Sequence, residues 1–285
     1  MVSRPALSVV VPVRDEATLL PRTVPALLAA AAGAAVEIVW VCNGCRDGSA
    51  RLIRRLAPGA RVIERAAPGK AAALQAGDEA LGDLFPRVYL DADTVLAPGD
   101  LLRLTAPLRD GSAEMTGPVH AFDGAGASAP SRAVGACWAS LPHAREAGFL
   151  GAVGVSAAGR ARWGRFPAVT GDDIFMAAMV PPERRRIVAE VVALSPLPAG
   201  FTGWVRRRAR WRRGEAELAR LGLAPPAAPG QRAALLARLL RPATAPGALA
   251  FAAARLLAGL AARADRRSPS WRPDRRGART ALPPH

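Results

Sequence analysis

Residues 87–93 read Arg-Val-Tyr-Leu-Asp-Ala-Asp, and this stretch decides the fold prediction for the chain. Its first four residues form a short apolar run that is typical of a buried strand, and the strand is expected to end at the two acids. Two carboxylates separated by one residue at a strand end can reach one divalent cation, and a hard cation there can hold a diphosphate. Because Asp-x-Asp also occurs by chance, its meaning depends on the segments around it.

Short β-rich runs alternate with helical stretches on the N-terminal side of this segment. The sequence predicts strands over residues 7–13, 36–41 and 61–64. Between and after them it predicts helices over about residues 16–31, 47–56 and 70–80. Such alternation favours right-handed βαβ units and a parallel sheet, with ligands bound beyond the carboxyl ends of the strands. The expected fold class is therefore α/β.

The sequence of the second half of the chain predicts further helices and a terminal tail. Residues 118–131 are rich in Gly, Ala and Ser and are expected to form a loop, followed by a helix over 133–141. A charged helix is expected over 206–217. Two leucine patterns at helical spacing follow it, made by Leu235, Leu236, Leu239 and Leu240 and by Leu249, Leu256 and Leu260. We therefore predict a main domain over 1–215, a C-terminal helical appendage over 216–264 and a disordered tail over 265–285.

The chain carries a large positive charge. It has 39 Lys and Arg residues against 23 Asp and Glu, for a formal net charge of +16, and Lys70 is its only lysine. This balance fits an anionic partner such as a membrane lipid or a diphosphate, and it equally fits the arginine-rich drift of a GC-rich coding sequence. Six arginines lie between Arg206 and Arg213, but only 5% of the residues are aromatic and the sequence has no nucleic-acid-reading motif. No nucleic-acid partner is expected.

The cysteines indicate a reducing compartment. Cys42, Cys45 and Cys137 are too few for a disulfide framework, and their odd number fits the cytoplasm. The first two form a C-x-x-C pattern, which is also found in zinc and redox sites, although structural zinc needs four ligands. No signal-peptide pattern opens the sequence, and its longest apolar stretch, residues 242–254, is interrupted by Arg255. We expect a cytoplasmic protein that is either soluble or peripheral at the inner membrane face.

Four further segments give the Asp-x-Asp stretch its meaning. They are residues 12–16 (Pro-Val-Arg-Asp-Glu), 42–49 (Cys-Asn-Gly-Cys-Arg-Asp-Gly-Ser), 69–77 (Gly-Lys-Ala-Ala-Ala-Leu-Gln-Ala-Gly) and 170–173 (Thr-Gly-Asp-Asp). In this order the chain resembles the family 2 glycosyltransferases over roughly residues 7–215. The resemblance implies the GT-A fold, a Rossmann-like nucleotide-diphospho-sugar transferase fold with a mixed sheet flanked by helices. It also implies an inverting, hexosyltransferase-like enzyme that uses Mg²⁺ or Mn²⁺ to move a sugar from a nucleotide-sugar donor to an acceptor hydroxyl.

The same resemblance assigns roles to the acids. Asp93 would bind the metal, and Asp91 would contact the metal or the nucleoside. Asp173 would be the general base that takes the proton of the acceptor hydroxyl, with Asp172 beside it. From the residues alone, Gly171, Asp172 and Asp173 can also begin the helix expected over 174–179, and the two roles are compatible.

The resemblance also implies donor-binding residues. The nucleoside pocket would be lined by Pro12, Val13, Arg14 and Glu16. Asn43 stands where the family has an acid, and an amide can hydrogen-bond a base through both of its polar groups. Gly69 and Lys70, at the start of a helix, would approach the phosphate or the nucleoside.

An arginine-rich element supplies the last assignment. Residues 207–211 match the family's Gln-x-x-Arg-Trp pattern with Arg207 in place of Gln. By resemblance, Arg210 and Trp211 would lie near the donor diphosphate and the acceptor, because a guanidinium fork suits phosphate oxygens.

The acceptor and two rival functions are left open by the sequence. A lipid-linked acceptor or a polysaccharide precursor is compatible, and the C-terminal helices either pack on the main domain or dock on an anionic membrane face. One rival is a non-catalytic GT-A-like protein that binds sugar nucleotides, since Cys42 and Arg207 replace an acid and a Gln. The other, less favoured, is a basic nucleic-acid-binding protein.

Overall fold

The computed structural model describes residues 6–142, 144, 149–223 and 230–264. These residues divide into two compact units. The first contains residues 6–120 and 149–195, and the second contains residues 121–144 and 196–264, without the undescribed positions.

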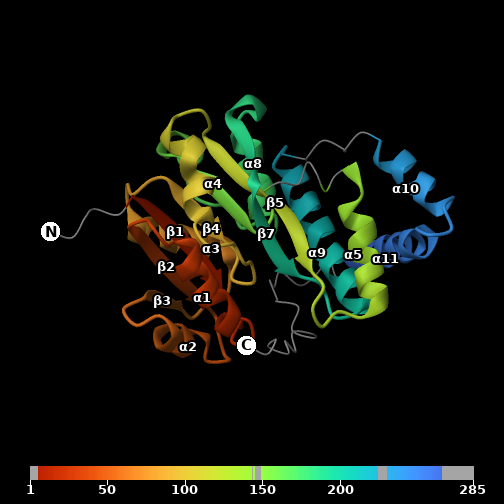
Figure 1. Ribbon diagram of the computed structural model, residues 1–285, viewed down its shortest axis with the longest axis horizontal. Helices are drawn as coiled ribbons and strands as arrows, with labels where there is room; N and C mark the ends of the chain where they lie inside the picture. Colours follow the sequence, from red (N-terminus) through yellow and green to blue (C-terminus); the bar gives the residue numbers. More distant parts are fainter. Residues whose placement is uncertain (1–5, 143, 145–148, 224–229, 265–285) are drawn as a thin grey trace. The chain divides into compact units, whose positions relative to one another are not determined.

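The strands form one seven-stranded mixed sheet in the order β3-β2-β1-β4-β6-β5-β7. Their bounds are β1 Leu7–Val13, β2 Val36–Asn43, β3 Arg61–Arg65, β4 Arg87–Leu90, β5 Met115–Asp123, β6 Ala152–Val155 and β7 Arg185–Pro196. The first four strands pair in parallel, and β6 runs antiparallel to both β4 and β5 (Figure 1). The prediction of an α/β fold with a mixed sheet flanked by helices is therefore confirmed.

Helices connect the strands in the first unit and dominate the second. The first unit contains α1 Leu20–Ala30, α2 Ser49–Leu56, α3 Lys70–Leu81, α4 Asp100–Arg109, α7 Ala157–Arg160 and α8 Asp172–Met179. The second contains α5 Ala129–Ala139, α9 Phe201–Arg220, α10 Gln231–Leu239 and α11 Ala245–Ala264. The strands expected in the first 90 residues are confirmed, and the helices expected there are found with slightly shifted ends.

Strand β1 explains why the first unit forms two layers of helices around the sheet. All seven of its residues are buried, as expected for a central parallel strand covered on both faces. Leu7, Val9 and Val11 belong to the hydrophobic core that also contains residues of α1, α2 and α4. Val10 points to the other face, against α3, where a Cβ atom on Gly77 would lie 2.8 Å from Val10 Cγ2. Because side chains alternate between the two faces along β1, the contact with Val10 shows that α3 covers the face opposite to α1.

A buried polar network fixes α3, β4 and α7 to one another. Asp78 Oδ1 accepts hydrogen bonds from Arg87 Nη1 at 2.6 Å and from the Tyr89 hydroxyl at 2.7 Å. Asp78 Oδ2 accepts from Arg160 Nε at 2.6 Å. Burying the Arg87 charge would be costly without such partners, so the network both satisfies the charges and orients β4 against α3.

The second unit is built around aromatic side chains. Trp204 of α9 is fully buried, and its indole N–H donates to Ser131 of α5. Phe122 packs edge-on against Trp138 and Trp204, with ring centroids 5.0 and 5.5 Å apart. Helices α5, α9 and α11 lie side by side around this cluster (Figure 1).

The apolar faces of α10 and α11 only partly match the usual amphipathic pattern. In α11 the buried face is made of Ala248, Phe251, Ala254 and Ala258. The larger leucines face outward, with 61% of Leu249 and 67% of Leu256 exposed, and Leu240 just after α10 is 84% exposed. Among the described residues, α11 is the one helix long and apolar enough to cross a membrane by length and composition, over Ala245–Ala262. It continues through Arg255, which the sequence prediction counted as an interruption.

Three expectations for the second half need correction or restriction. The loop expected over 118–131 is wrong, because residues up to 123 belong to β5 and α5 begins at Ala129. Strand β7 was not predicted, because its exposed and buried residues do not alternate regularly. The expected boundary between residues 215 and 216 falls inside α9, and the expected tail over 265–285 lies outside the described residues.

Candidate functional site

Most of the predicted acids meet in one pocket of the first unit. It lies at the carboxyl ends of β1 and β4 and at the first turns of α3 and α8, and it encloses about 240 Å³ including space open to solvent. The pocket is lined by Pro12, Lys70, Leu74, Tyr89, Leu90, Asp91, Phe149, Gly151, Ala152, Val153, Asp172, Asp173 and Met176. Residues separated by more than 100 positions in the chain therefore share one site.

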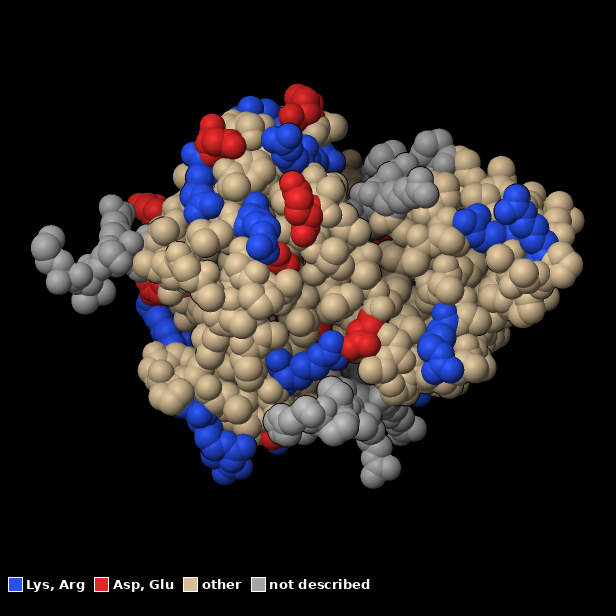
Figure 2. Space-filling view, in the orientation of Figure 1, with Lys and Arg blue, Asp and Glu red and all other residues tan. Residues whose placement is uncertain are grey.

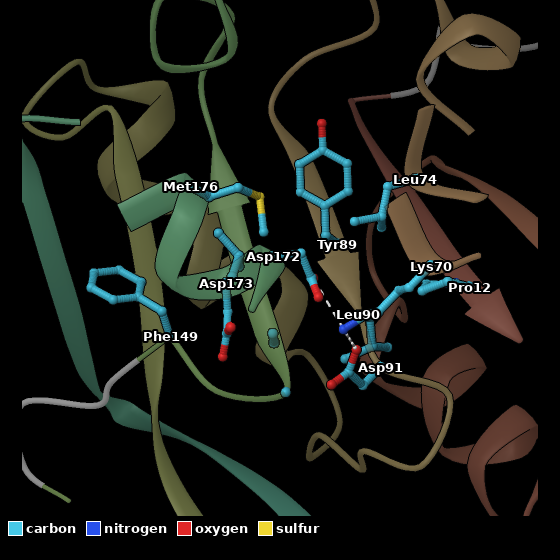
Figure 3. Close-up of a pocket in the computed structure, with 13 residues that line it drawn as sticks. Pro12, Lys70, Leu74, Tyr89, Leu90, Asp91, Phe149, Asp172, Asp173 and Met176 are labelled. Atoms are coloured by element: carbon cyan, nitrogen blue, oxygen red, sulfur yellow. Dashed lines mark ion pairs between the residues drawn. The ribbon is translucent and has the colours of Figure 1, made fainter. Parts of the chain in front are cut away.

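Lys70 occupies the centre of the charged part of this pocket. Its Nζ lies 2.6 Å from Asp91 Oδ1 and 3.0 Å from Asp172 Oδ2, and Figure 3 shows it between the two carboxylates. Burial lowers the pKa of Lys70, but the negative charges of Asp172, Asp91 and Asp173 outweigh burial and raise that pKa well above its usual value. The ammonium group is thus held charged at a place where two carboxylates would otherwise repel one another.

Local structure explains how Lys70 reaches Asp91. Arg87 and Tyr89 of β4 point toward Asp78 of α3, so the same alternation directs Asp91 to the α3 side of the sheet. Helix α3 begins at Lys70, and its N-terminus therefore stands over the end of β4. Asp91 and Lys70 meet because Asp91 lies on the face of the sheet that α3 covers and because α3 begins at Lys70.

Asp172 and Asp173 lie in the first turn of α8, where the helix N-terminus favours negative charge. Asp172 is buried, and burial raises its pKa although Lys70 acts in the opposite direction. Asp173 is half-buried, and its Oδ1 accepts the Ile174 N–H at 2.9 Å. Burial and the charge of Asp172 raise the pKa of Asp173 to about 6. Figure 3 shows the carboxylate of Asp173 apart from the contacts that Lys70 makes with Asp91 and Asp172.

Asp93 lies two residues after Asp91, in the turn that follows β4. The turn is closed by the Thr94 N–H donating to the Asp91 carbonyl at 3.0 Å, and Asp93 is half-buried within it. Among the described residues, no group of three or more His, Cys, Asp or Glu side chains could hold a metal ion by itself. Mg²⁺ commonly binds through one or two carboxylates together with substrate phosphates and waters. Asp93, with Asp91 nearby, is a donor set of that kind, and it therefore fits a cation that arrives with a diphosphate.

The residues expected at the nucleoside end are partly engaged with the protein itself. Asn43 is fully buried, its Nδ2 donates to the Val13 carbonyl at 2.9 Å, and its Oδ1 accepts the Gly69 N–H at 2.9 Å. Asn43 thus joins the end of β1 to the start of α3. Pro12 lines the pocket, and Arg14 and Glu16 are half-buried in the loop after β1.

Arg210 and Trp211 belong to α9 in the second unit, and they do not line the pocket. Trp211 packs near Trp138 with ring centroids 6.1 Å apart, and the Arg208 guanidinium lies 5.4 Å above its ring. Arg207, which replaces the family's Gln, lies over the rings of Phe122 and Trp204 and donates to the Pro196 carbonyl at 3.0 Å. In the described structure this element holds the aromatic core of the second unit together.

Eight of the thirteen pocket residues were not among the predicted site residues, and Tyr89, Met176 and Phe149 are the instructive ones. Tyr89 could have been found, because it has the same parity on β4 as Asp91. Met176 follows Asp172 by four residues, a spacing that places both on one face of α8. Phe149 had no signal in the sequence, because it reaches the pocket only through the folding of the chain before β6.

This arrangement combines a carboxylate of raised pKa and a charged lysine within one pocket, while Asp93 lies in the adjoining turn, outside the pocket lining. A carboxylate with a pKa near 6 is ionised at neutral pH and still basic enough to accept a proton. The lysine and a bound cation could together neutralise a phosphate leaving group. The site is therefore suited to displacing a phosphate-bearing group with a hydroxyl nucleophile.

Comparisons with known proteins identify similar chains. A family model described as "Glycosyl transferase family 2" matches residues 8–170. The chain is similar in structure to a mannosyltransferase from Pyrobaculum calidifontis, PcManGT, solved with GDP-Man and Mn²⁺, at 22% identity and a TM-score of 0.57, covering 92% of this chain and 80% of that one. It is also similar to residues 1–349 of S. aureus TarS, solved with UDP-GlcNAc, at 12% identity and a TM-score of 0.50, covering 67% of this chain and 58% of that one. At these identities the structural likeness shows the fold alone. No curated protein matches the chain.

Proposed function

The chain belongs to glycosyl transferase family 2 and has the GT-A fold, and on that premise we propose that it transfers a sugar from a nucleotide-sugar donor to an acceptor hydroxyl with inversion at the anomeric carbon. The observation that carries this proposal is the placement of Asp91, Lys70 and Asp172 in direct contact beside Asp173. Pro12 lines the pocket on the β1 side, so a nucleotide sugar bound there would lie along the ends of the strands.

The leaving group is a nucleoside diphosphate, whose negative charge increases as the glycosidic bond breaks. Lys70 is held charged at the N-terminus of α3, where its ammonium and the free amides of the first turn suit phosphate oxygens. Mg²⁺ or Mn²⁺ bound at Asp93 would supply further positive charge to the diphosphate. Asp91 and Asp172 keep the lysine in place before the donor binds.

Asp173 is the residue we assign as general base. Its Oδ1 accepts the Ile174 N–H, and its raised pKa of about 6 suits proton transfer from a hydroxyl at neutral pH. Asp172, by contrast, is buried against Lys70 and acts as the positioning residue of the pair. A single displacement needs one general base on the acceptor side, and Asp173 would serve as that base.

The structure says less about the chemical identity of the acceptor than about that of the donor. The exposed leucines around α10 and α11, among arginines and without acidic residues from Gly230 to Ala264, are suited to the headgroup region of an anionic bilayer. A lipid-linked acceptor and a peripheral position at the inner membrane face would follow. A polysaccharide precursor is the alternative if these leucines do not bind membrane.

The two rival functions make different predictions. A non-catalytic sugar-nucleotide-binding protein would bind the donor without cleaving it. A nucleic-acid binder would need a continuous basic surface, and on the face shown in Figure 2 the Lys and Arg side chains lie in separate groups among uncharged residues. The transferase is therefore the function that the pocket supports best.

The decisive experiment is a donor screen. UDP-, GDP- and dTDP-sugars would each be added with and without Mn²⁺, and thermal unfolding would be followed by scanning calorimetry. A bound donor at a hundredfold excess over its dissociation constant should raise the free energy of unfolding by about 2.7 kcal/mol. Donors that stabilise the protein would then be tested for metal-dependent release of the nucleoside diphosphate. Stabilisation without release would favour the non-catalytic rival, and no stabilisation by any donor would contradict the proposal.

A further inference from the structure

Two cysteines flank the turn that follows β2, and the proposed reaction uses neither of them. Cys42 is buried in the core of the first unit, and Cys45 packs against the same core while half-buried. The Cys45 thiol donates to the Val13 carbonyl at 3.4 Å, and Cys42 is the partner of Val13 in the register of β1 and β2. Two thiols beside the same residue, in a C-x-x-C turn and packed on the same core, are placed for disulfide formation.

We propose that Cys42 and Cys45 form a reversible disulfide, installed by a low-molecular-weight disulfide, and that this bond weakens donor binding. The disulfide itself stands on the geometry of the turn. Its effect on the donor rests on the proposed function.

The environments of the two thiols differ in a way that sets the order of the exchange. Contact with Cys42 and the hydrogen bond from the Asp15 backbone lower the pKa of Cys45, against an opposing effect of burial. Contact with Cys45 and burial raise the pKa of Cys42. The more exposed Cys45 is therefore the thiol that ionises and attacks first.

The exchange balances without any further reactant. The Cys45 thiolate attacks one sulfur of the small disulfide, whose S–S bond breaks and releases one thiolate. The Cys42 thiol then loses its proton and attacks Cys45 Sγ, which displaces the second small thiolate and leaves the Cys42–Cys45 bond. Two protein thiols and one small disulfide thus become one protein disulfide and two small thiols, and a dithiol reductant reverses the change.

The turn between the cysteines is in direct contact with the donor-binding segment. Asn43, inside the turn, holds the Val13 carbonyl and the Gly69 N–H at 2.9 Å each. Gly44 adopts a φ of +68°, and a Cβ atom there would lie 3.2 Å from Pro68. The turn therefore rests against the residues immediately before Lys70.

Closing the disulfide has a defined effect on these contacts. The sulfur atoms must approach to about 2.05 Å, and the Cys45 S–H that donates to Val13 is lost. The turn that carries Asn43 and Gly44 must shift against Pro68 and Gly69. Because Gly69 precedes Lys70, the oxidised protein holds its phosphate-binding lysine less well.

The first measurement counts thiols in the full chain. The reduced protein is incubated with oxidised glutathione, unfolded, alkylated and analysed by mass spectrometry. The chain has three cysteines, so we expect three alkylated thiols before oxidation and one afterwards, with Cys42 and Cys45 linked in one peptide. Retention of all three thiols, or glutathione attached to Cys45 without an internal bond, would overturn the proposal.

The second measurement tests the consequence in two independent ways. Calorimetric titration with the donor identified by the screen and Mn²⁺ should show about tenfold weaker binding in the oxidised protein, which corresponds to about 1.4 kcal/mol, with recovery after reduction. Hydrogen exchange should be faster at the Gly69 amide in the oxidised protein, whether or not a donor is present. A disulfide that changes neither the dissociation constant nor this exchange rate would overturn the regulatory part.

Matched variants assign the effect to the pair. Cys137→Ala, in the second unit, should show the same oxidant-dependent loss of affinity as the unmodified chain. Cys45→Ala should bind the donor with an affinity that the oxidant does not change, and Cys42→Ala should stop at a mixed disulfide on Cys45 with no internal bond. If the reduced protein binds no nucleotide sugar at all, the proposed function fails, while the thiol count and the Gly69 exchange rate still show whether the disulfide forms and whether it loosens the contact with Gly69.

Discussion

Replacing Asp173 with Asn should abolish turnover and at the same time stabilise the protein. In the folded protein, burial and Asp172 raise the pKa of Asp173 from 3.8 to about 6. A difference of about two units corresponds to about 3 kcal/mol between the two protonation states. Because the side chain is only half-buried, solvent screening reduces the expected gain in the free energy of unfolding to about 1 kcal/mol. A melting temperature higher by about 2–4 °C would follow.

The sign of this effect fixes its pH window. A carboxyl group whose pKa is raised in the folded state disfavours folding only when it is ionised. Its contribution is absent below the unfolded pKa of 3.8, grows as the pH rises toward about 6, and is constant above that. Asp173→Asn should therefore match the unmodified protein in stability near pH 3.8 and exceed it at pH 7.

The assay combines kinetics with thermal unfolding across pH. In the unmodified enzyme, kcat should rise with pH and level off above about 6, as Asp173 becomes ionised. Removing a general base typically costs about a hundred- to ten-thousandfold in rate, so Asp173→Asn should lose turnover to that extent while donor affinity changes little. Asp172→Asn is the matched control, because it removes a partner of Lys70 and should lower the melting temperature.

Two results would refute this reasoning. If Asp173→Asn is destabilised as much as Asp172→Asn, the ionised carboxylate of Asp173 does not lower the free energy of unfolding. If Asp173→Asn keeps the turnover of the unmodified enzyme while Asp172→Asn loses it, the base is Asp172.

Three further tests concern the proposed metal ligand, the contact of Gly77 in α3 with β1, and the outward leucines of the second unit. Asp93→Asn should lose Mn²⁺-dependent donor binding in calorimetry at an unchanged melting temperature, and retained metal dependence would contradict the assignment. Gly77→Ala should lower the free energy of unfolding by about 1–3 kcal/mol in denaturant titrations, because its methyl group would overlap Val10, and Val10→Ala should recover part of the loss. If the second unit docks on membranes, the full chain should sediment with anionic but not neutral vesicles, and the paired change of Leu240 and Leu256 to Ser should remove binding without lowering the melting temperature. Binding that survives this change would place the membrane contact elsewhere.

The parallel strands could be predicted from the sequence because a strand that is buried on both faces is apolar throughout. A central parallel strand is covered on both faces, so β1 appears as an unbroken apolar run from Leu7 to Val13. The motif acids could be placed at strand ends for the same reason, since each run stops where polar residues begin. Family membership followed from the order of these segments, and it is confirmed by the match over residues 8–170.

The rest of the sheet could not be predicted in the same way. Strand β5 is buried over its first four residues and more exposed afterwards, and the segment that follows it is rich in Gly, Ala and Ser, which suggested a loop. Strand β7 mixes exposed and buried positions because its neighbours cover it unevenly. Such strands are defined by their partners in the sheet, and the sequence of one strand does not name its partner.

Only the tertiary structure decided what the site residues do to one another. The sequence selected Lys70, Asp91, Asp172 and Asp173 separately, and it presented Asn43 as a group for reading a base. Folding brings Lys70 between Asp91 and Asp172, leaves Asp173 with a raised pKa, and occupies both amide groups of Asn43 with backbone partners. Charge, burial and hydrogen bonding depend on distances between segments far apart in the chain, and those distances are fixed by packing, whereas the side chains themselves are fixed by the sequence.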